Sequence, residues 1–192
     1  MKQICVYASS SEVVDRQYRK SAEELGALLG KTGFTLIYGA GCIGLMGDVA
    51  RAAHKHNGHV IGVIPQKLNK PGIVYDAADE LIVTKTMRER KATMETLADA
   101  FIVLPGGYGT LEEMFEIIVL RQLQYTTKPL VIMNINGMYD SLLHFLDQLV
   151  EKKFIRKQHR YLFHAVDSPV DALHYLQSYT PDVISSKLEI AP

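Results

Sequence analysis

The stretch LPGGYGTLEEMFE, residues 104–116, decides the fold of this chain. It follows the apolar run AFIVL (100–104), turns through three glycines and then enters a helical pattern that carries acidic residues and leucine. A strand, a glycine turn and a helix in this order form the repeating unit of an open parallel sheet. The stretch also raises a chemical question, because a turn made almost wholly of backbone is followed closely by a carboxylate.

Five further runs rich in Val, Ile, Phe and Tyr extend this pattern along the chain, at 4–8, 34–38, 59–64, 80–84 and 129–135. They lack the alternation of polar and apolar residues, which indicates strands that are covered on both faces. Helix-period segments lie between most of them, at 13–31, 44–57, 87–98, 110–125 and 139–153. We therefore predict an α/β protein with a Rossmann-like three-layer fold, in which helices flank a mostly parallel central sheet.

The end of the chain adds one more unit to this fold. A short apolar run at 161–166 precedes a last helix, which we predict over 169–179. The residues that follow have no period. Because 192 residues suit one compact domain, we predict a single Rossmann-like domain over 1–180 and a C-terminal tail over 181–192.

Charge and composition exclude several classes of protein. Lys plus Arg and Asp plus Glu number 21 each, so the chain has no global basic field for a nucleic-acid partner. No stretch approaches the roughly 20 apolar residues of a membrane span, and the first apolar run is shorter than the roughly 7 to 15 residues of a signal-peptide core. Cys5 and Cys42 make no disulfide framework. We expect a soluble cytoplasmic protein with reduced thiols and no membrane partner.

Three loops follow predicted strands, ASSS (8–11), YGAGCIGLMG (38–47) and LPGGYGT (104–110). In an open parallel sheet, ligands bind outside the carboxyl ends of the strands. Two of the loops open a helix with glycines, which let backbone N–H groups approach a phosphate at the positive end of the helix dipole. We therefore predict phosphate binding at this edge of the sheet.

Gly39, Gly41 and Gly44 spell the G-x-G-x-x-G fingerprint of dinucleotide-binding proteins. However, the motif follows the second predicted strand, and the residues directly after the third strand, Pro65, Gln66 and Lys67, offer no acidic group for a ribose hydroxyl. The sequence favours phosphate binding over NAD binding. The alternative is that these glycines only allow close packing of helix and strand.

Thr110 and Glu113 have the T-x-x-E spacing of a capping box, in which the carboxylate would bind an N–H group of its own helix. The alternative is chemical. We expect Glu112 and Glu113 to lie in the first helical turn, where the dipole favours anions and keeps a carboxylate ionised, as a nucleophile or a stabiliser of positive charge should be.

The segment TMRERKATM, residues 86–94, places Arg88, Arg90 and Lys91 at the start of a helix, where cations oppose the dipole. This indicates an anionic partner, with a salt-bridged surface helix as the alternative. Arg90 is the candidate to reach Glu113 or a ligand phosphate, because its planar guanidinium can donate two parallel hydrogen bonds to either group.

The histidines indicate no metal site. His54, His56 and His59 lie near the end of a predicted helix, and no carboxylate or cysteine stands at a metal-ligand spacing. We predict neither a metal nor a cofactor.

The motif PGGYGTLEE (105–113), together with MRERK (87–91) and GLMG (44–47), resembles the LONELY GUY (LOG) family of cytokinin riboside 5′-monophosphate phosphoribohydrolases. The resemblance runs from about residue 2 to residue 178. It implies a Rossmann-like homodimer that hydrolyses the N-glycosidic bond of an adenine nucleoside 5′-monophosphate and releases the base and ribose 5-phosphate. The sequence departs from many members in its second loop, which reads G-G-G-S or G-G-G-x in those members and Gly39-Ala40-Gly41-Cys42 here, without a hydroxyl at Cys42.

Carried over by position, the resemblance implies that Arg90 and Glu113 are catalytic. The predicted substrate-binding residues come from the strand-end loops and the starts of the two helices that carry this pair: Ser9, Gly41, Cys42, Gly44, Met87, Lys91, Gly106, Gly107, Tyr108, Gly109, Thr110 and Glu112. Cleavage of a nucleoside C–N bond develops positive charge on the ribose, which a carboxylate can stabilise. The chemistry and the motif therefore agree.

Two rival functions remain open at this point. Many LOG relatives carry a lysine decarboxylase label, but a pyridoxal enzyme needs a Schiff-base lysine in a pocket with a partner for the pyridinium nitrogen, and nothing in the sequence marks one. A non-catalytic nucleotide-binding or cofactor-carrier protein could use the same loops. The pairing of Arg90 with Glu113 argues against it, since a pure binder gains nothing from a carboxylate beside a phosphate.

Overall fold

The computed structural model describes residues 2–181. Its strands form one sheet in the order β4-β3-β2-β1-β5-β6-β7, and every pair of neighbours is parallel. Their bounds are β1 Gln3–Tyr7, β2 Thr35–Tyr38, β3 Val60–Pro65, β4 Glu80–Thr84, β5 Ala100–Val103, β6 Leu130–Met133 and β7 His164–Val166. The predicted Rossmann-like fold is confirmed, and the described sheet is wholly parallel.

Burial explains why these segments are strands. All residues of β3, β5 and β6 are buried, because helices cover both faces of the sheet there. β4 lies at the edge of the sheet and is the exception, since Leu81 and Val83 remain partly exposed. The continuous apolar runs of the sequence therefore correspond to the central strands.

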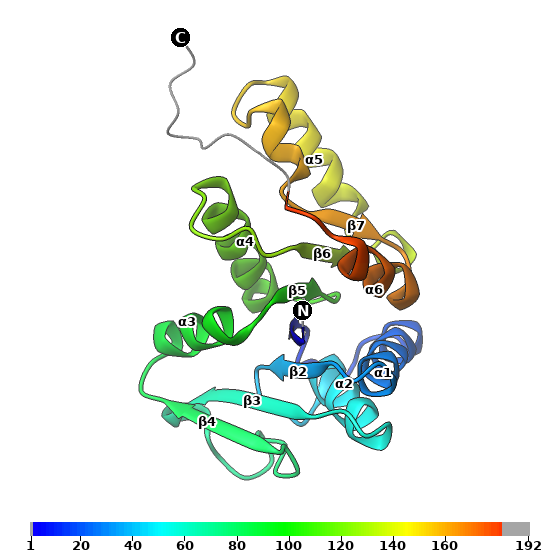
Figure 1. Cartoon of the computed structure of the whole chain (residues 1–192), viewed down its shortest axis with the longest axis vertical. Helices are drawn as coiled ribbons and strands as arrows, with labels where there is room; N and C mark the ends of the chain where they lie inside the picture. The colour runs from blue at the N-terminus through cyan, green and yellow to red at the C-terminus, as the bar shows by residue number, and fades with distance from the viewer. Residues whose placement is uncertain (1, 182–192) are drawn as a thin grey trace.

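Two layers of helices flank the sheet (Figure 1). One layer contains α1 (Arg16–Lys31), α2 (Gly44–Lys55) and α6 (Pro169–Ser178), and the other contains α3 (Met87–Leu97), α4 (Tyr108–Gln122) and α5 (Asp140–Glu151). Each layer has its own apolar core against the sheet. Short 3-10 helices lie at Gln66–Leu68, Ile135–Gly137 and Lys157–Tyr161.

The strand order places a ligand site at one edge of the sheet. The chain runs outward from β1 through β2 and β3 to β4, then returns to the other side of β1 with β5. The order therefore reverses between β1 and β5, and a crevice opens outside the carboxyl ends of the strands at such a switch point. The loops that follow β1, β2 and β5 are the three that the sequence analysis selected.

Some predicted bounds differ from the structure. The helix predicted from residue 110 begins at Tyr108, and the run at 161–166 forms a strand only from His164. The predicted tail at 181–192 lies, apart from Pro181, outside the described residues. Within residues 2–181, no helix has the length and apolar character needed to cross a membrane.

Candidate active site

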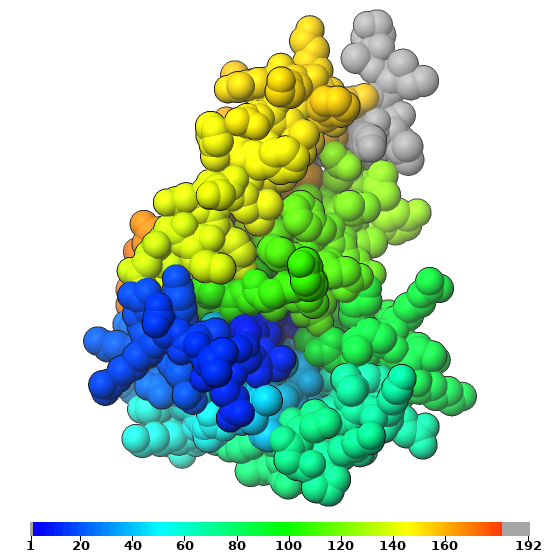
Figure 2. Space-filling view, turned by 180° about the vertical axis from the view of Figure 1, so that it is seen from behind, coloured from blue at the N-terminus to red at the C-terminus, as the bar shows by residue number. Residues whose placement is uncertain are grey.

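A cavity of about 720 Å³ lies at the carboxyl edge of the sheet. The loops after β1, β2, β3 and β5 line it together with the first turns of α3 and α4. Figure 2 shows the blue N-terminal segment and the green and cyan-green segments of the middle of the chain meeting on one face of the molecule. Ser9 joins three of these parts, because its N–H group donates to the carbonyl of Pro105 at 3.3 Å and its carbonyl accepts from the Met46 N–H group at 3.1 Å.

An ion pair between Arg90 and Glu113 lies in this cavity. The Arg90 Nη1 atom donates to Glu113 Oε1 at 2.6 Å, and the two side chains are only 10% and 12% exposed. The residues come from different helices, α3 and α4, and are 23 positions apart in the sequence. The predicted contact between them is confirmed.

The Arg90 guanidinium is fixed from several sides. Its Nε atom donates to the carbonyl of Val63 at 3.0 Å, and its Nη1 atom lies 3.6 Å from the Met87 sulfur. Gly39 lies directly beside it, and a Cβ atom at this position would overlap the guanidinium. The first glycine of the G-x-G-x-x-G motif is therefore required by a close approach to Arg90.

Burial raises the pKa of the Glu113 carboxyl above its ordinary value, and the nearby Arg90 opposes this shift without cancelling it. The expectation that the helix dipole keeps Glu113 ionised is wrong, because the dipole acts too weakly at this position. Because α4 begins at Tyr108, Glu112 and Glu113 lie beyond the first turn, where the dipole no longer acts strongly. Arg90 provides the compensating charge instead.

The capping-box interpretation of Thr110 and Glu113 is also wrong. Gly107 is the N-cap of α4, so Thr110 lies inside the helix and is buried there. A side-chain cap does occur at α3, where the Thr86 hydroxyl accepts from the Glu89 N–H group at 3.1 Å. Glu113 is therefore free of a capping role and faces Arg90.

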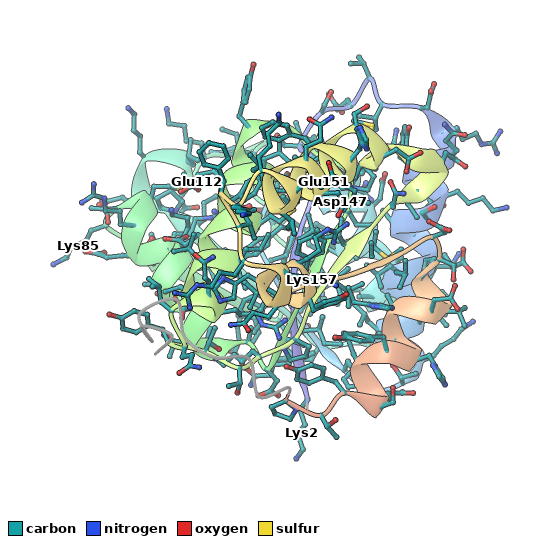
Figure 3. All side chains as sticks on the ribbon, turned by 90° about the horizontal axis from the view of Figure 1, so that it is seen from above. Lys2, Lys85, Glu112, Asp147, Glu151 and Lys157 are labelled. Atoms are coloured by element: carbon teal, nitrogen blue, oxygen red, sulfur yellow. The ribbon has the colours of Figure 1, made fainter. Side chains whose placement is uncertain are left out.

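A second set of ion pairs runs beside the first. Lys91 binds both Glu112 and Glu116 of α4, the latter at 3.0 Å. The cations at the start of α3 therefore find anionic partners on the neighbouring helix, while Arg88 is exposed. Figure 3 shows Glu112, on the helix that follows β5, well apart from Lys2, which precedes β1 at the amino end of that strand.

The structure brings most of the predicted site residues to the cavity. Beside Arg90 and Glu113, the predicted residues that line it are Ser9, Gly41, Met87, Lys91, Gly107, Tyr108, Gly109, Thr110 and Glu112. Three predicted residues do not line it, Cys42, Gly44 and Gly106. Cys42 is turned toward a neighbouring loop, Gly44 packs against the backbone of Ser9–Ser11, and Gly106 packs against the Thr110 side chain.

One part of the cavity was missed by the sequence analysis. Residues 66–79, which we call the strap, follow β3 and lie against the glycine loop through a bridge between Gly41 and Val74. The strap contributes Leu68 and Ile73 to the lining. Apolar side chains such as Leu68 and Ile73, in a turn-rich segment without helix or strand periodicity, were the available signal.

Strap residues and their neighbours make one wall of the cavity apolar. Its members are Ile43, Ile64, Leu68, Ile73 and Met87. Four of them are partly exposed, between 37% and 45%. Exposed apolar side chains that gather in a concave site mark a place where a ligand binds.

The histidines serve structural contacts. His54 bonds to the Tyr75 hydroxyl at 3.0 Å and to Asp79 at 2.8 Å, which ties α2 to the strap. Across the described residues 2–181, no group of three or more His, Cys, Asp and Glu side chains could hold a metal ion.

Comparison with known proteins places this geometry in a family. The family described as "Possible lysine decarboxylase" matches residues 46–176, which is more than half of the chain. A protein of Oryza sativa subsp. japonica named "Probable cytokinin riboside 5′-monophosphate phosphoribohydrolase LOGL9" is 43% identical over 180 residues, covering 94% of this chain and 79% of the relative. This chain belongs to the LOG family. LOG7 of Arabidopsis thaliana, named a cytokinin riboside 5′-monophosphate phosphoribohydrolase, is 41% identical over 97% of this chain and 87% of its own length.

The LOG fold also occurs in proteins with other names. The molybdenum cofactor binding protein of Rippkaea orientalis has a TM-score of 0.71 at 23% identity, covering 93% of this chain and 97% of its own. The molybdenum cofactor carrier protein of Chlamydomonas reinhardtii has a TM-score of 0.68 at 21% identity, over 92% and 96%. At this distance the likeness concerns the fold alone.

Proposed function

We propose that this protein hydrolyses the N-glycosidic bond of adenine-type nucleoside 5′-monophosphates, cytokinin riboside 5′-monophosphates among them. The products are the free base and ribose 5-phosphate. The buried Arg90–Glu113 ion pair in the cavity carries the proposal. The names of the LOG relatives support it, since they describe the same reaction.

In the proposed mechanism, Glu113 acts on the ribose carbon that carries the base. The C–N bond breaks, its electron pair leaves with the base, and positive charge develops on the ribose. The Glu113 carboxylate stabilises this charge and accepts a proton from the water that attacks the carbon. Glu113 then releases this proton and the base gains one, so that the net reaction adds OH to the ribose and H to the base and consumes one water. The raised pKa of Glu113 suits a group that must take up a proton.

Arg90 has the role of holding Glu113 in its ionised form and in place. The hydrogen bond to Val63 and the missing side chain of Gly39 leave the guanidinium little freedom, so its charge stays beside the carboxylate. An ionised pair in a buried site acts more strongly than it would in water, since the local dielectric is low.

The start of α4 is the proposed phosphate anchor. The first N–H groups of a helix have no acceptor within the helix, and Gly107, Tyr108, Gly109 and Thr110 place these groups at the cavity. They attract an anion together with the helix dipole. Binding of the phosphate there would position the ribose at Glu113, one turn further along the same helix.

The order of the strands favours an extended substrate. The phosphate anchor follows β5, while the apolar wall lies beside the ends of β2 and β3. Three strand spacings of about 4.8 Å separate β5 from β3, on the order of 14 Å in all. A nucleotide anchored at β5 would therefore point its base at the apolar wall. We propose that this wall receives the base and an apolar substituent on it.

The test is chromatography of reactions with AMP and, separately, N6-isopentenyl-AMP. We expect the wild-type protein to release free base and the Glu113→Gln variant to release none. Glu116→Gln is the matched control, because Glu116 stands nearly one turn away on the same helix and does not line the cavity. It should retain turnover.

Other outcomes decide against the proposal. Nucleotides that bind but stay intact over hours would favour a carrier function. A Glu113→Gln protein that still releases base would remove Glu113 from the mechanism. An absorbance band of bound pyridoxal phosphate in the purified protein would favour a decarboxylase.

A cytoplasmic homodimer is the proposed working form. The two free cysteines suit a reducing compartment. Val119 on α4, Phe145 on α5 and Phe154 after it are partly or largely exposed, which favours burial against a second copy. Light scattering coupled to size-exclusion chromatography should give twice the mass of one chain, and a mass of one chain would contradict the dimer.

A further inference from the structure

A buried carboxylate outside the proposed mechanism lies between α1 and α2. Asp48 of α2 has a side chain only 3% exposed. It binds Arg19 of α1 through two hydrogen bonds of 2.8 and 2.9 Å, and Arg51 of its own helix at 2.6 Å. Burial opposes ionisation of Asp48, but the hydrogen bonds from both arginines outweigh it and lower the pKa of the carboxyl. Asp48 is therefore a charged anchor for two arginines.

The two arginines differ in what else they touch. Arg51 uses its second terminal nitrogen, Nη1, to donate to the backbone carbonyl of Cys42 at 2.6 Å. The Arg19 side chain, by contrast, forms its described hydrogen bonds with Asp48 and not with the loop after β2. Among the side chains of residues 2–181, Arg51 is the one that joins the buried carboxylate to the loop after β2.

Cys42 is in turn hydrogen-bonded to the strap. Its N–H group donates to the carbonyl of Ile73 at 2.9 Å, and its thiol donates to the carbonyl of Gly72 at 3.0 Å. All three polar groups of Cys42 are therefore engaged outside the cavity. Its two neighbours, Gly41 and Ile43, line the cavity, and so does Ile73 of the strap.

The glycine loop, residues 39–43 between β2 and α2, depends on such external contacts. It forms no regular strand or helix, and Ala40 within it and Gly44 at the start of α2 have positive φ angles of 59° and 60°. Because the peptide unit is planar, a hydrogen bond to the Cys42 carbonyl also fixes the direction of the Ile43 N–H group. A guanidinium held by a buried carboxylate is a rigid donor for this purpose.

We propose that Arg51, held by Asp48, is a positioning residue for the substrate cavity. Through Cys42 it sets the glycine loop and the strap in the places where Gly41, Ile43 and Ile73 meet the substrate. Arg51 itself does not line the cavity. The inference rests on the proposed function insofar as a nucleotide is the ligand of that cavity.

The test compares Arg51→Met with Arg19→Met. The two arginines are matched, since both bind Asp48 and their side chains are 45% and 39% exposed. We expect Arg51→Met to raise KM for the nucleotide about tenfold, the loss typical of one charge-assisted hydrogen bond, with kcat within about twofold of wild type. Arg19→Met should leave KM within about twofold. Equal KM values for the two variants, raised or unchanged, would overturn the proposal.

A second variant tests the role of the carboxylate. Asp48→Asn keeps the size of the side chain and removes its charge, so it weakens the hold on Arg51 without deleting the guanidinium. We expect KM to rise, by less than in Arg51→Met, and an unchanged KM would overturn the role of Asp48. Thermal unfolding of each variant verifies that the compared proteins are folded.

Binding measurements separate this proposal from the proposed function. Calorimetric titration with ribose 5-phosphate, a product of the proposed reaction, gives dissociation constants that do not depend on turnover, and titration with AMP gives them where AMP is not hydrolysed. If the wild-type protein binds AMP without hydrolysing it, the proposed reaction fails. The positioning role is then decided by whether Arg51→Met weakens binding about tenfold while Arg19→Met does not.

Discussion

At the scale of single residues, the site contains the ion pair of Arg90 and Glu113, and neighbouring charges affect the pKa of Glu113. Burial raises the pKa of Glu113, and Arg90 opposes that shift most strongly. Glu112 raises the pKa further, while Lys91 lowers it. The two outer residues also bind each other, so the pair Lys91 and Glu112 lies beside the reactive pair with opposite effects on it.

The pH dependence of activity should reveal these opposite effects. In the proposed mechanism Glu113 must be ionised, so turnover falls as the pH drops through its raised pKa, at a higher pH than an ordinary glutamate would give. Lys91→Met removes a charge that lowers this pKa, and the acid limb of kcat should move to higher pH. Glu112→Gln removes a charge that raises it, and the limb should move to lower pH. Shifts in the same direction would contradict this account.

Gly39 should tolerate no side chain. Gly39→Ala would drive a Cβ atom into the Arg90 guanidinium and displace it from Glu113. We expect kcat to fall about 100-fold, the usual cost of a displacement near 1 Å at a reacting centre. Gly41→Ala is the control for kcat: its Cβ atom would meet only the Met46 side chain, so this variant can change KM but should leave kcat near wild type. Similar losses in both variants would point to a general disturbance of the loop.

At the scale of elements, the sequence predicted the strands and helices better than it predicted the irregular strap. β5, for example, is a continuous apolar run that ends at a glycine turn, and its bounds could be predicted closely. The start of α4 was placed too late, because Tyr108 and Gly109 weaken the helical pattern although the backbone is already helical there. The strap has no period, and its place over the cavity depends on contacts with Gly41 and Cys42 that are distant in sequence.

The strap should determine which base the protein prefers. Ile73→Ala removes apolar surface from the wall that we propose for a substituent on the base. We expect the ratio of kcat/KM for N6-isopentenyl-AMP over AMP to fall about tenfold, as for the loss of contacts in an apolar pocket. Val170→Ala on α6 changes an exposed β-branched residue that does not line the cavity and should leave the ratio unchanged. An unchanged ratio in Ile73→Ala would place the substituent elsewhere.

At the scale of the whole molecule, the three-layer architecture could be predicted, and the ties between distant parts could not. One such tie is Arg121, near the end of α4, which is buried and donates to the Leu162 carbonyl at 2.6 Å and to the Tyr179 hydroxyl at 2.9 Å. It joins the second helix layer to the last residues of the described chain. Nothing in the helical pattern around residue 121 distinguishes a buried arginine from an exposed one.

Arg121 should matter for stability and not for catalysis. Arg121→Met leaves the Leu162 carbonyl and the Tyr179 hydroxyl without this donor, which should lower the free energy of unfolding by about 3 kcal/mol. Because Glu113 lies two turns away along the helix, KM and kcat at low temperature should stay near wild type. Urea denaturation measures the first expectation and steady-state kinetics the second. Unchanged stability would show that water replaces the arginine at no cost.

The two helix layers support different parts of the cavity. Arg90 and Glu113 face each other across α3 and α4 on one side of the sheet, whereas the glycine loop and the strap are fastened to α2 on the other side. In the proposed function, the residues that cleave the bond and the glycine loop and strap that select the ligand are therefore supported by different cores. During evolution, mutations can therefore change the side that selects the ligand while the Arg90–Glu113 pair stays intact. Descendants of one ancestral enzyme could acquire new substrates in this way without a change of fold. They could also lose catalysis and keep ligand binding.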